Sequence, residues 1–282
     1  MSDSILASLT FGYAFVAVLH ICGLTMLCWV RFSPVNQRTI LIHLAISELG
    51  NALTLTIIYL FLQFKGCNHN CYLTEIFFAT LFTVTNKMLI IYLICDRMLE
   101  VHLNIKYPLY FTENKVKKMI MGLWIVTAGY SLTIVLFVKF DVSTDKSRLA
   151  VMTSVVVVED VIIVLTAVIT YVILYRKVKN VIARSKVQTQ VQNNVTDTRS
   201  KFLLPSLIVA SYMLLNLAGD VMFLCSITLA KKVTSLNPVC RLFWILGWIA
   251  DGILYIFFQK SIRKRLIALC RRQSSRVSLS NS

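Results

Sequence analysis

Long apolar runs separated by short polar segments repeat along the whole chain. A helix that spans the hydrocarbon core of a bilayer needs about 20 predominantly apolar residues. Seven runs come close to that length or exceed it, and they cover residues 6–30, 40–64, 74–95, 119–138, 149–175, 202–229 and 242–258. The pattern therefore predicts an all-α fold, a bundle of seven transmembrane helices over residues 6–258.

The polar segments leave no room for a soluble domain. Residues 1–5 form a short segment before the first run, and residues 176–201 form the longest polar stretch between two runs. Residues 259–282 begin with a basic, amphipathic segment, which predicts a short helix on the membrane surface followed by a tail. The first run follows Asp3 instead of a basic segment and is too long for a signal peptide, so it is expected to be a retained helix.

Composition and charge exclude an ordinary soluble enzyme. Hydrophobic residues make up 57% of the chain and charged residues 15%, whereas soluble domains carry about 25% charged residues. The 29 Lys and Arg against 13 Asp and Glu give a formal charge of +16. In a soluble protein this excess would suggest nucleic acid. Here the basic residues lie between apolar runs, so they indicate membrane topology, and no nucleic-acid partner is expected.

The distribution of basic residues predicts the orientation in the lipid bilayer. With the amino terminus outside, the cytoplasmic segments hold 21 Lys and Arg and the outer segments hold seven. Such an excess on one side follows the positive-inside rule. The prediction is a multi-pass protein with an extracellular N-terminus, a third intracellular loop at residues 176–201 and a cytoplasmic tail.

Cysteine and histidine spacing predicts no metal site. The eight cysteines include no C-x-x-C pair and no nearby histidine cluster. Cys67 and Cys71 precede the third run on the predicted outer side, where oxidising conditions permit a disulfide. Cys240 begins the seventh run on the same side, so Cys71 can pair with Cys67 or with Cys240.

Short motifs lie at the predicted helix ends. The third run ends in Asp96-Arg97-Met98, and the seventh contains Asp251-Gly252-Ile253-Leu254-Tyr255. The second run carries Leu44-Ala45-Ile46-Ser47-Glu48-Leu49, and Tyr171 lies near the inner end of the fifth. The basic segment after Tyr255 leads to Cys270, which is a candidate for palmitoylation.

These four motifs, in their order along the chain, resemble those of the class A, rhodopsin-like, G-protein-coupled receptors over nearly the whole chain. The resemblance implies a plasma-membrane receptor that binds an extracellular or membrane-delivered ligand and activates heterotrimeric G-proteins, with arrestin and receptor kinases as further partners. It assigns coupling and activation to Asp96, Arg97, Tyr171 and Tyr255. No enzyme activity and no cofactor are implied.

The departures from the family pattern concern the sixth helix and the ligand. Where the family carries F-x-x-C-W-x-P, this chain has neither the tryptophan nor the proline, so Asn216 and Gly219 are the candidates for a bend. Amine receptors of the family carry an aspartate where Ala79 stands, and opsins carry a lysine where Ile245 stands. Neither an amine nor retinal is therefore the expected ligand.

Six acidic or basic residues, Glu48, Lys87, Glu159, Asp160, Asp220 and Asp251, lie well inside the predicted spans, and each costs a few kcal/mol or more unless it is paired or hydrated. They are candidates for function, with inter-helix contacts as the alternative. The resemblance places Lys87 near Glu159 and Asp160, and Asp220 on the face that lines the ligand pocket.

The resemblance also implies a central polar site made of Glu48, Asn86 and Asp251, which in the family holds a sodium ion. Two carboxylates that face each other in a low dielectric cannot both ionise cheaply. Few further polar neighbours are expected around them, so a shared proton is favoured over sodium.

The tail carries two arginines before Ser274, with Ser275 and Ser278 following. This charge pattern makes the three serines phosphorylation candidates, and a merely solvated tail is the alternative.

A transporter and an enzyme are the two alternative classes of function. A polytopic transporter would also use buried carboxylates, but it would usually show inverted repeats or broken helices. An enzyme would need a nucleophile with a base or with metal ligands, and the sequence shows no such arrangement.

Overall fold

All the secondary structure that the structure describes is helical. The computed structural model describes residues 3–29, 35–64, 69–103, 106–140, 158–170, 172–173, 176, 206–228 and 236–257. The elements are α1 (Asp3–Trp29), α2 (Val35–Phe64), α3 (His69–Leu103), α4 (Tyr107–Tyr110), α5 (Glu113–Phe140), the π-helical turn η2 (Tyr212–Asn216), α8 (Leu217–Thr228) and α9 (Leu236–Phe257). Residues 158–170 are also helical.

Six helical segments among these residues are long and apolar enough to cross a membrane. They are Ser4–Trp29, Asn36–Phe64, Leu73–Glu100, Glu113–Lys139, Ser206–Phe223 and Pro238–Ile256. They correspond to six of the seven predicted runs. Of the remaining run, 149–175, the structure describes residues 158–170, 172 and 173. The described chain is thus that of a multi-pass helical membrane protein, with six spans identified.

The outward faces of the helices are apolar as well as the inward faces. On α5, Ile125 and Val126 are 70% and 71% exposed, whereas Val116 and Ile120 of the same helix are fully buried. A helix that is apolar on all sides is found in large protein cores or in membranes. The exposed apolar side chains of this bundle are therefore those that lipid would cover.

Several helices begin earlier than the apolar runs predict. The second begins at Val35 instead of residue 40, and the last at Leu236 instead of residue 242. Hydropathy marks only the apolar part of a helix, whereas backbone hydrogen bonds continue through polar residues at its ends. Arg241, which the charge count placed in a loop, consequently lies inside α9.

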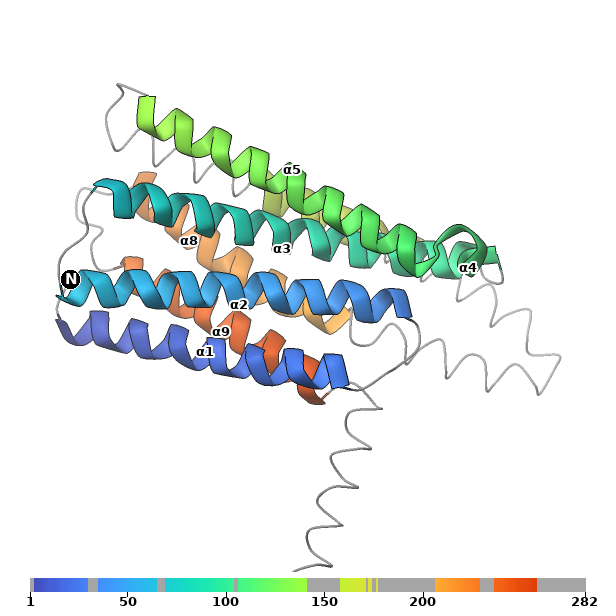
Figure 1. Ribbon diagram of the computed structural model, residues 1–282, viewed down its shortest axis with the longest axis horizontal. Helices are drawn as coiled ribbons and strands as arrows, with labels where there is room; N and C mark the ends of the chain where they lie inside the picture. Colours follow the sequence, from blue (N-terminus) through green and yellow to red (C-terminus); the bar gives the residue numbers. More distant parts are fainter. Residues whose placement is uncertain are drawn as a thin grey trace, which may run out of the picture.

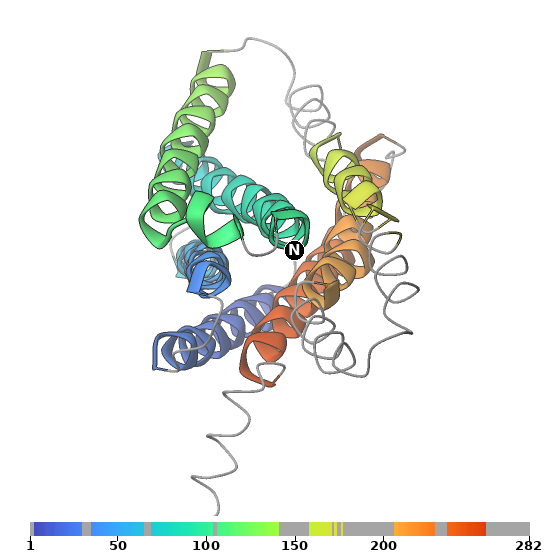
Figure 2. The same cartoon turned by 90° about the vertical axis from the view of Figure 1, so that its right-hand side faces the viewer.

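The helices lie side by side as a bundle (Figure 1). α2 packs between α1 and α3, α5 packs on α3, and α9 lies between α1 and α8. The view along the bundle shows residues 158–170, drawn in yellow-green, beside α8 (Figure 2). We call the end that holds Arg97, near the end of α3, the Arg97 end, and the opposite end, where α3 begins, the Glu75 end.

Two local features shape the contact between α8 and α9. The π-helical turn η2 precedes α8 and includes Asn216, one of the two residues expected to allow a bend. The other, Gly219, lies so close to α9 that a Cβ atom there would be 2.6 Å from the Nε1 atom of Trp244. Only glycine fits at position 219 without a shift of the indole ring. The π-helical turn η2 is of interest for a different reason, because such turns are frequent at functional sites.

Candidate functional site

The first polar cluster lies at the Arg97 end and is built on the last turns of α3. Arg97 is only 2% exposed. Its Nε atom donates to Asp96 Oδ2 over 3.1 Å, and its Nη2 atom donates to the same oxygen. Its Nη1 atom donates to Glu100, one turn further along the helix. The guanidinium group is thus surrounded by two carboxylates of its own helix.

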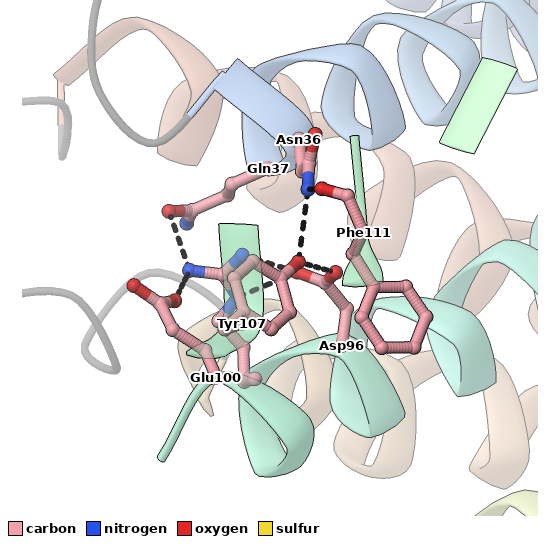
Figure 3. Close-up of polar contacts among 7 residues, drawn as sticks. Asn36, Gln37, Asp96, Glu100, Tyr107 and Phe111 are labelled. Carbon is pink, nitrogen blue, oxygen red and sulfur yellow. Dashed lines mark hydrogen bonds and ion pairs between the residues drawn. The ribbon is translucent and has the colours of Figure 1, made fainter. Parts of the chain in front are cut away.

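Residues from other elements complete this Arg97 cluster (Figure 3). The Tyr107 hydroxyl donates to Asp96 Oδ1, and Asn36 donates to the Tyr107 hydroxyl over 3.1 Å. Gln37 Oε1 accepts from Arg97 Nη1 at 3.4 Å. Burial and the neighbouring Asp96 charge raise the pKa of Tyr107, so its hydroxyl stays protonated and remains a donor. The cluster therefore ties the start of α2 and α4 to the end of α3.

The second cluster, in the middle of the bundle, brings together the predicted residues Glu48, Asn86 and Asp251. Glu48 is 1% exposed, and its Oε1 atom accepts from Asn86 Nδ2 over 3.2 Å. Asp251 is fully buried and interacts electrostatically with Glu48, and neither of its oxygens has a hydrogen-bond partner. Tyr255, one turn beyond Asp251 on α9, also faces Glu48.

His20 of α1 belongs to this central cluster, although no sequence pattern singled it out. Its Nε2 atom lies 3.1 Å from the Trp248 carbonyl oxygen, and its Nδ1 atom lies 3.3 Å from Glu48 Oε2. If Nε2 donates to the carbonyl group, the contact with Glu48 is favourable only when a proton lies on Nδ1 or on the carboxyl group. The protonation states of Glu48 and of the His20 imidazole therefore depend on each other.

The third cluster surrounds Lys87, which is 3% exposed. The Nζ atom of Lys87 lies 2.7 Å from Asp160 Oδ1, 3.7 Å from Asp220 Oδ2 and 3.9 Å from Glu159 Oε2. Asp160 also accepts a hydrogen bond from the Tyr212 hydroxyl in η2. One ammonium group therefore faces three carboxylates and bonds directly to one of them. The predicted neighbours Glu159 and Asp160 are joined here by Asp220.

A cavity of about 340 Å³ extends from the Glu75 end to this Lys87 cluster. Its wall includes the three acidic residues Glu75, Glu159 and Asp220, together with Trp244 and Trp248. The cavity lies at the lower end of the range of about 300–1,000 Å³ that is usual for small-molecule sites. The cavity is large enough for a small organic molecule. Ala79, which stands where amine receptors carry an aspartate, is also part of its wall.

Of the other predicted site residues, Tyr255 lies in the central cluster and not beside Arg97, and the rest belong to none of the three clusters or are outside the described residues. Tyr255 makes its ring contact with His20, at 5.9 Å between centroids, in the central cluster. Cys240 is buried and is a free cysteine. The structure does not describe Tyr171, Cys67, the side chain of Cys71, Cys270, Ser274, Ser275 or Ser278.

The arrangement defines a class in structural terms: a multi-pass helical membrane protein with an Arg-carboxylate cluster at one end, a polar centre and a cavity reaching the other end. No family model matches the chain, and no curated protein sequence is significantly similar to it. Any functional conclusion therefore depends on the residues themselves.

Proposed function

We propose that the chain is a receptor of the class A G-protein-coupled type, in the plasma membrane, with its N-terminus outside and its tail in the cytoplasm. The observation that supports the proposal is the Arg97 cluster, a buried arginine held by Asp96 at the end of the bundle opposite the cavity. In this proposal the Arg97 end faces the cytoplasm and the Glu75 end faces outside. The basic segments predicted on the cytoplasmic side agree with this orientation.

The contacts suggest how such a receptor would be held at rest. Arg97 can bind a G-protein only when its guanidinium group leaves Asp96 and Glu100. Tyr107 and Asn36 stabilise Asp96 in its present position, so they favour the resting arrangement. An activating ligand would have to bind the alternative arrangement more tightly than the resting one. The difference in binding free energy would have to offset these hydrogen bonds.

The connection from cavity to Arg97 cluster would pass through the middle of the bundle. Tyr212 of η2 binds Asp160 in the Lys87 cluster, and Asn86 of α3 lines the cavity and binds Glu48. A ligand that moves α3 or η2 would thus act on both the Lys87 cluster and the central cluster. This contiguity supports coupling between the cavity and the central cluster.

Guanine-nucleotide exchange tests the proposal. Membranes that contain the full chain should accelerate exchange on at least one heterotrimeric G-protein. Arg97→Ala should abolish the acceleration while the protein is still present in the membrane, because alanine removes every donor of the guanidinium fork. Lys117→Ala is the control, since Lys117 lies near the same end in an exposed pair with Glu113. Undiminished exchange by Arg97→Ala would contradict the assignment.

One observation also fits the alternative class, a transporter with buried carboxylates: the Lys87 cluster combines three acids and a lysine beside a cavity. The two proposals differ in flux. A transporter reconstituted in liposomes would move its substrate or protons across the bilayer, as followed by a pH-sensitive dye, whereas the receptor would show no flux above empty liposomes.

A further inference from the structure

The Lys87 cluster contains more carboxyl groups than its one lysine can pair with. Lys87 bonds at 2.7 Å to Asp160, whose side chain is fully buried. The carboxylates of Glu159 and Asp220 lie 3.9 Å and 3.7 Å from the Lys87 ammonium group, beyond hydrogen-bond distance. Their side chains remain 19% and 11% exposed, and both residues line the cavity. These two carboxylates are therefore within reach of a ligand.

The cavity wall, like the Lys87 cluster, has more acidic than basic residues. Glu75, Glu159 and Asp220 face two bases, Lys87 and Arg241. The guanidinium group of Arg241 lies 5.1 Å from the centre of the Tyr59 ring, so it has an aromatic contact of its own. With Asp160 bonded to Lys87, the cavity and the group behind it contain four acids and two bases. A ligand carboxylate would enter a site that is already too acidic.

Buried polar atoms without partners point to missing donors. Asn51 and Asn86 line the cavity, are 5% and 7% exposed, and have Oδ1 atoms without a hydrogen-bond partner. The amide nitrogen of Asn86 already donates to Glu48, so its oxygen is left as an acceptor. Glu159 Oε2 also lacks a hydrogen-bond donor. Asn216 and Trp244 are the opposite case, with donors, Nδ2 and Nε1, that have no hydrogen-bond partner. Unsatisfied buried groups are costly. The unpartnered acceptors of this wall outnumber its unpartnered donors by three to two, so the wall lacks donors more than it lacks acceptors.

The remaining wall suits an apolar body. Phe223, Trp244 and Trp248 line the cavity, and aromatic faces also attract organic cations. Among the residues that the structure describes, no group of three His, Cys, Asp or Glu is arranged to hold a metal ion. The excess of acidic residues favours a cation, and the aromatic wall favours an organic cation over an inorganic one.

We propose that the cavity binds a small organic cation, an ammonium or guanidinium group on an apolar body, with the charged group against Glu159 and Asp220. This inference deepens the proposed receptor function by naming its ligand class. It also revises the expectation against amines that Ala79 suggested, because the acids come from other positions than the one Ala79 occupies.

Binding to the purified full chain in lipid nanodiscs tests the inference. The probes are tryptamine and 2-phenylethylguanidine, each compared with the matching alcohol and carboxylate, and empty nanodiscs correct for partition into lipid. The two cations should bind at least about tenfold more tightly than the alcohols, since hydrogen bonds to charged groups are the stronger ones. The carboxylates should bind most weakly. Equal binding of cation and alcohol, tighter binding of the carboxylates, or no binding of either cation overturns the proposal.

Two variants locate the charged group. Asp220→Asn and Glu159→Gln keep the shape of the side chains and should each weaken binding of the cations by about tenfold. Binding of the alcohols should change little, which shows that the cavity is still formed. Glu113→Gln is the matched control, since Glu113 pairs with exposed Lys117 outside the cavity. Unchanged cation affinity in the double variant of Asp220 and Glu159 would also overturn the proposal.

The ligand class and the receptor function can fail separately. Cations that bind at Asp220 and Glu159 but leave nucleotide exchange unaltered would contradict the receptor function and retain the ligand class. Exchange that depends on Arg97 in a chain that binds neither cation would contradict the ligand class alone.

Discussion

The Arg97 cluster and the Lys87 cluster both bury a cation among acids, yet they are built in different ways. Arg97 receives its two carboxylates from Asp96 and Glu100, on the same helix and within three residues. Lys87 receives its carboxylates from Glu159 and Asp160 in residues 158–170 and from Asp220 in α8. The first cluster is local in sequence, and the second depends on the packing of three segments.

The two clusters also differ in how completely their polar atoms are used. Asp96 is bonded through both oxygens, to Arg97 and to Tyr107. In the Lys87 cluster, Asp160 Oδ2 and Glu159 Oε2 have no hydrogen-bond partner. A guanidinium group can serve several acceptors in fixed directions, whereas an ammonium group acts as a compact charge. The difference suggests that the Arg97 cluster is a fully bonded contact that holds one arrangement of the helices. The Lys87 cluster, in contrast, has polar atoms left over beside the cavity, where a ligand would bind.

The largest expected effect comes from removing the lysine. Lys87→Met leaves three acids around an apolar side chain, and breaking a buried ion pair in this way costs about 3–5 kcal/mol. Thermal unfolding of the purified protein should show the loss, and adding Asp160→Asn should recover part of it. Lys117→Met, in a pair with about half of each side chain exposed, should change stability by less than about 1 kcal/mol. Equal stability of the two single variants would mean that the Lys87 cluster is not held by its lysine.

A smaller effect is expected in the Arg97 cluster. Tyr107→Phe removes the hydroxyl that donates to Asp96, and it should raise basal nucleotide exchange about tenfold or more, because a hydrogen bond to a charged group contributes about 1.5–3 kcal/mol. Tyr110→Phe is the matched control, on the same short helix α4 but 57% exposed. A rise of equal size in both variants, or none in Tyr107→Phe, would contradict the idea that Tyr107 holds the resting arrangement.

The smallest effect concerns the central cluster between the two. If Glu48 and Asp251 share a proton whose loss opposes activation, basal exchange should rise as the pH falls and respond little to sodium. Asp251→Asn should flatten this dependence, because the amide cannot titrate. The measurement is basal exchange of both proteins across pH at fixed sodium and across sodium at fixed pH. A strong response to sodium together with no response to pH would favour an ion at this site.

Sequence patterns were sufficient for features that are local. Apolar length alone located six spans, and Asp96 and Arg97 adjoin each other in the chain, so their pairing needs no knowledge of the fold. The first residues of α2 and α9 were predicted too late in the chain, since hydropathy does not register polar helical turns.

Contacts between distant segments were harder to predict. His20 is a single histidine in an apolar run, and only the packing of α1 against α2 and α9 brings it to Glu48 and Trp248. Tyr107 gave no signal either, because its contact with Asp96 depends on how the chain turns between α3 and α5. Asp220 was expected to face the cavity, but its approach to Lys87 depends on η2.

The π-helical turn also changes how positions along this helix should be counted. Eight residues separate Tyr212 from Asp220, and in an uninterrupted α-helix they would turn through about 800°, leaving the two side chains about 80° apart. A π-helical turn winds through a smaller angle per residue, which reduces this difference, and both side chains indeed reach the Lys87 cluster. The turn thus acts as a one-residue insertion. An ungapped alignment that is in phase at Tyr212 is out of phase from Leu217 onwards.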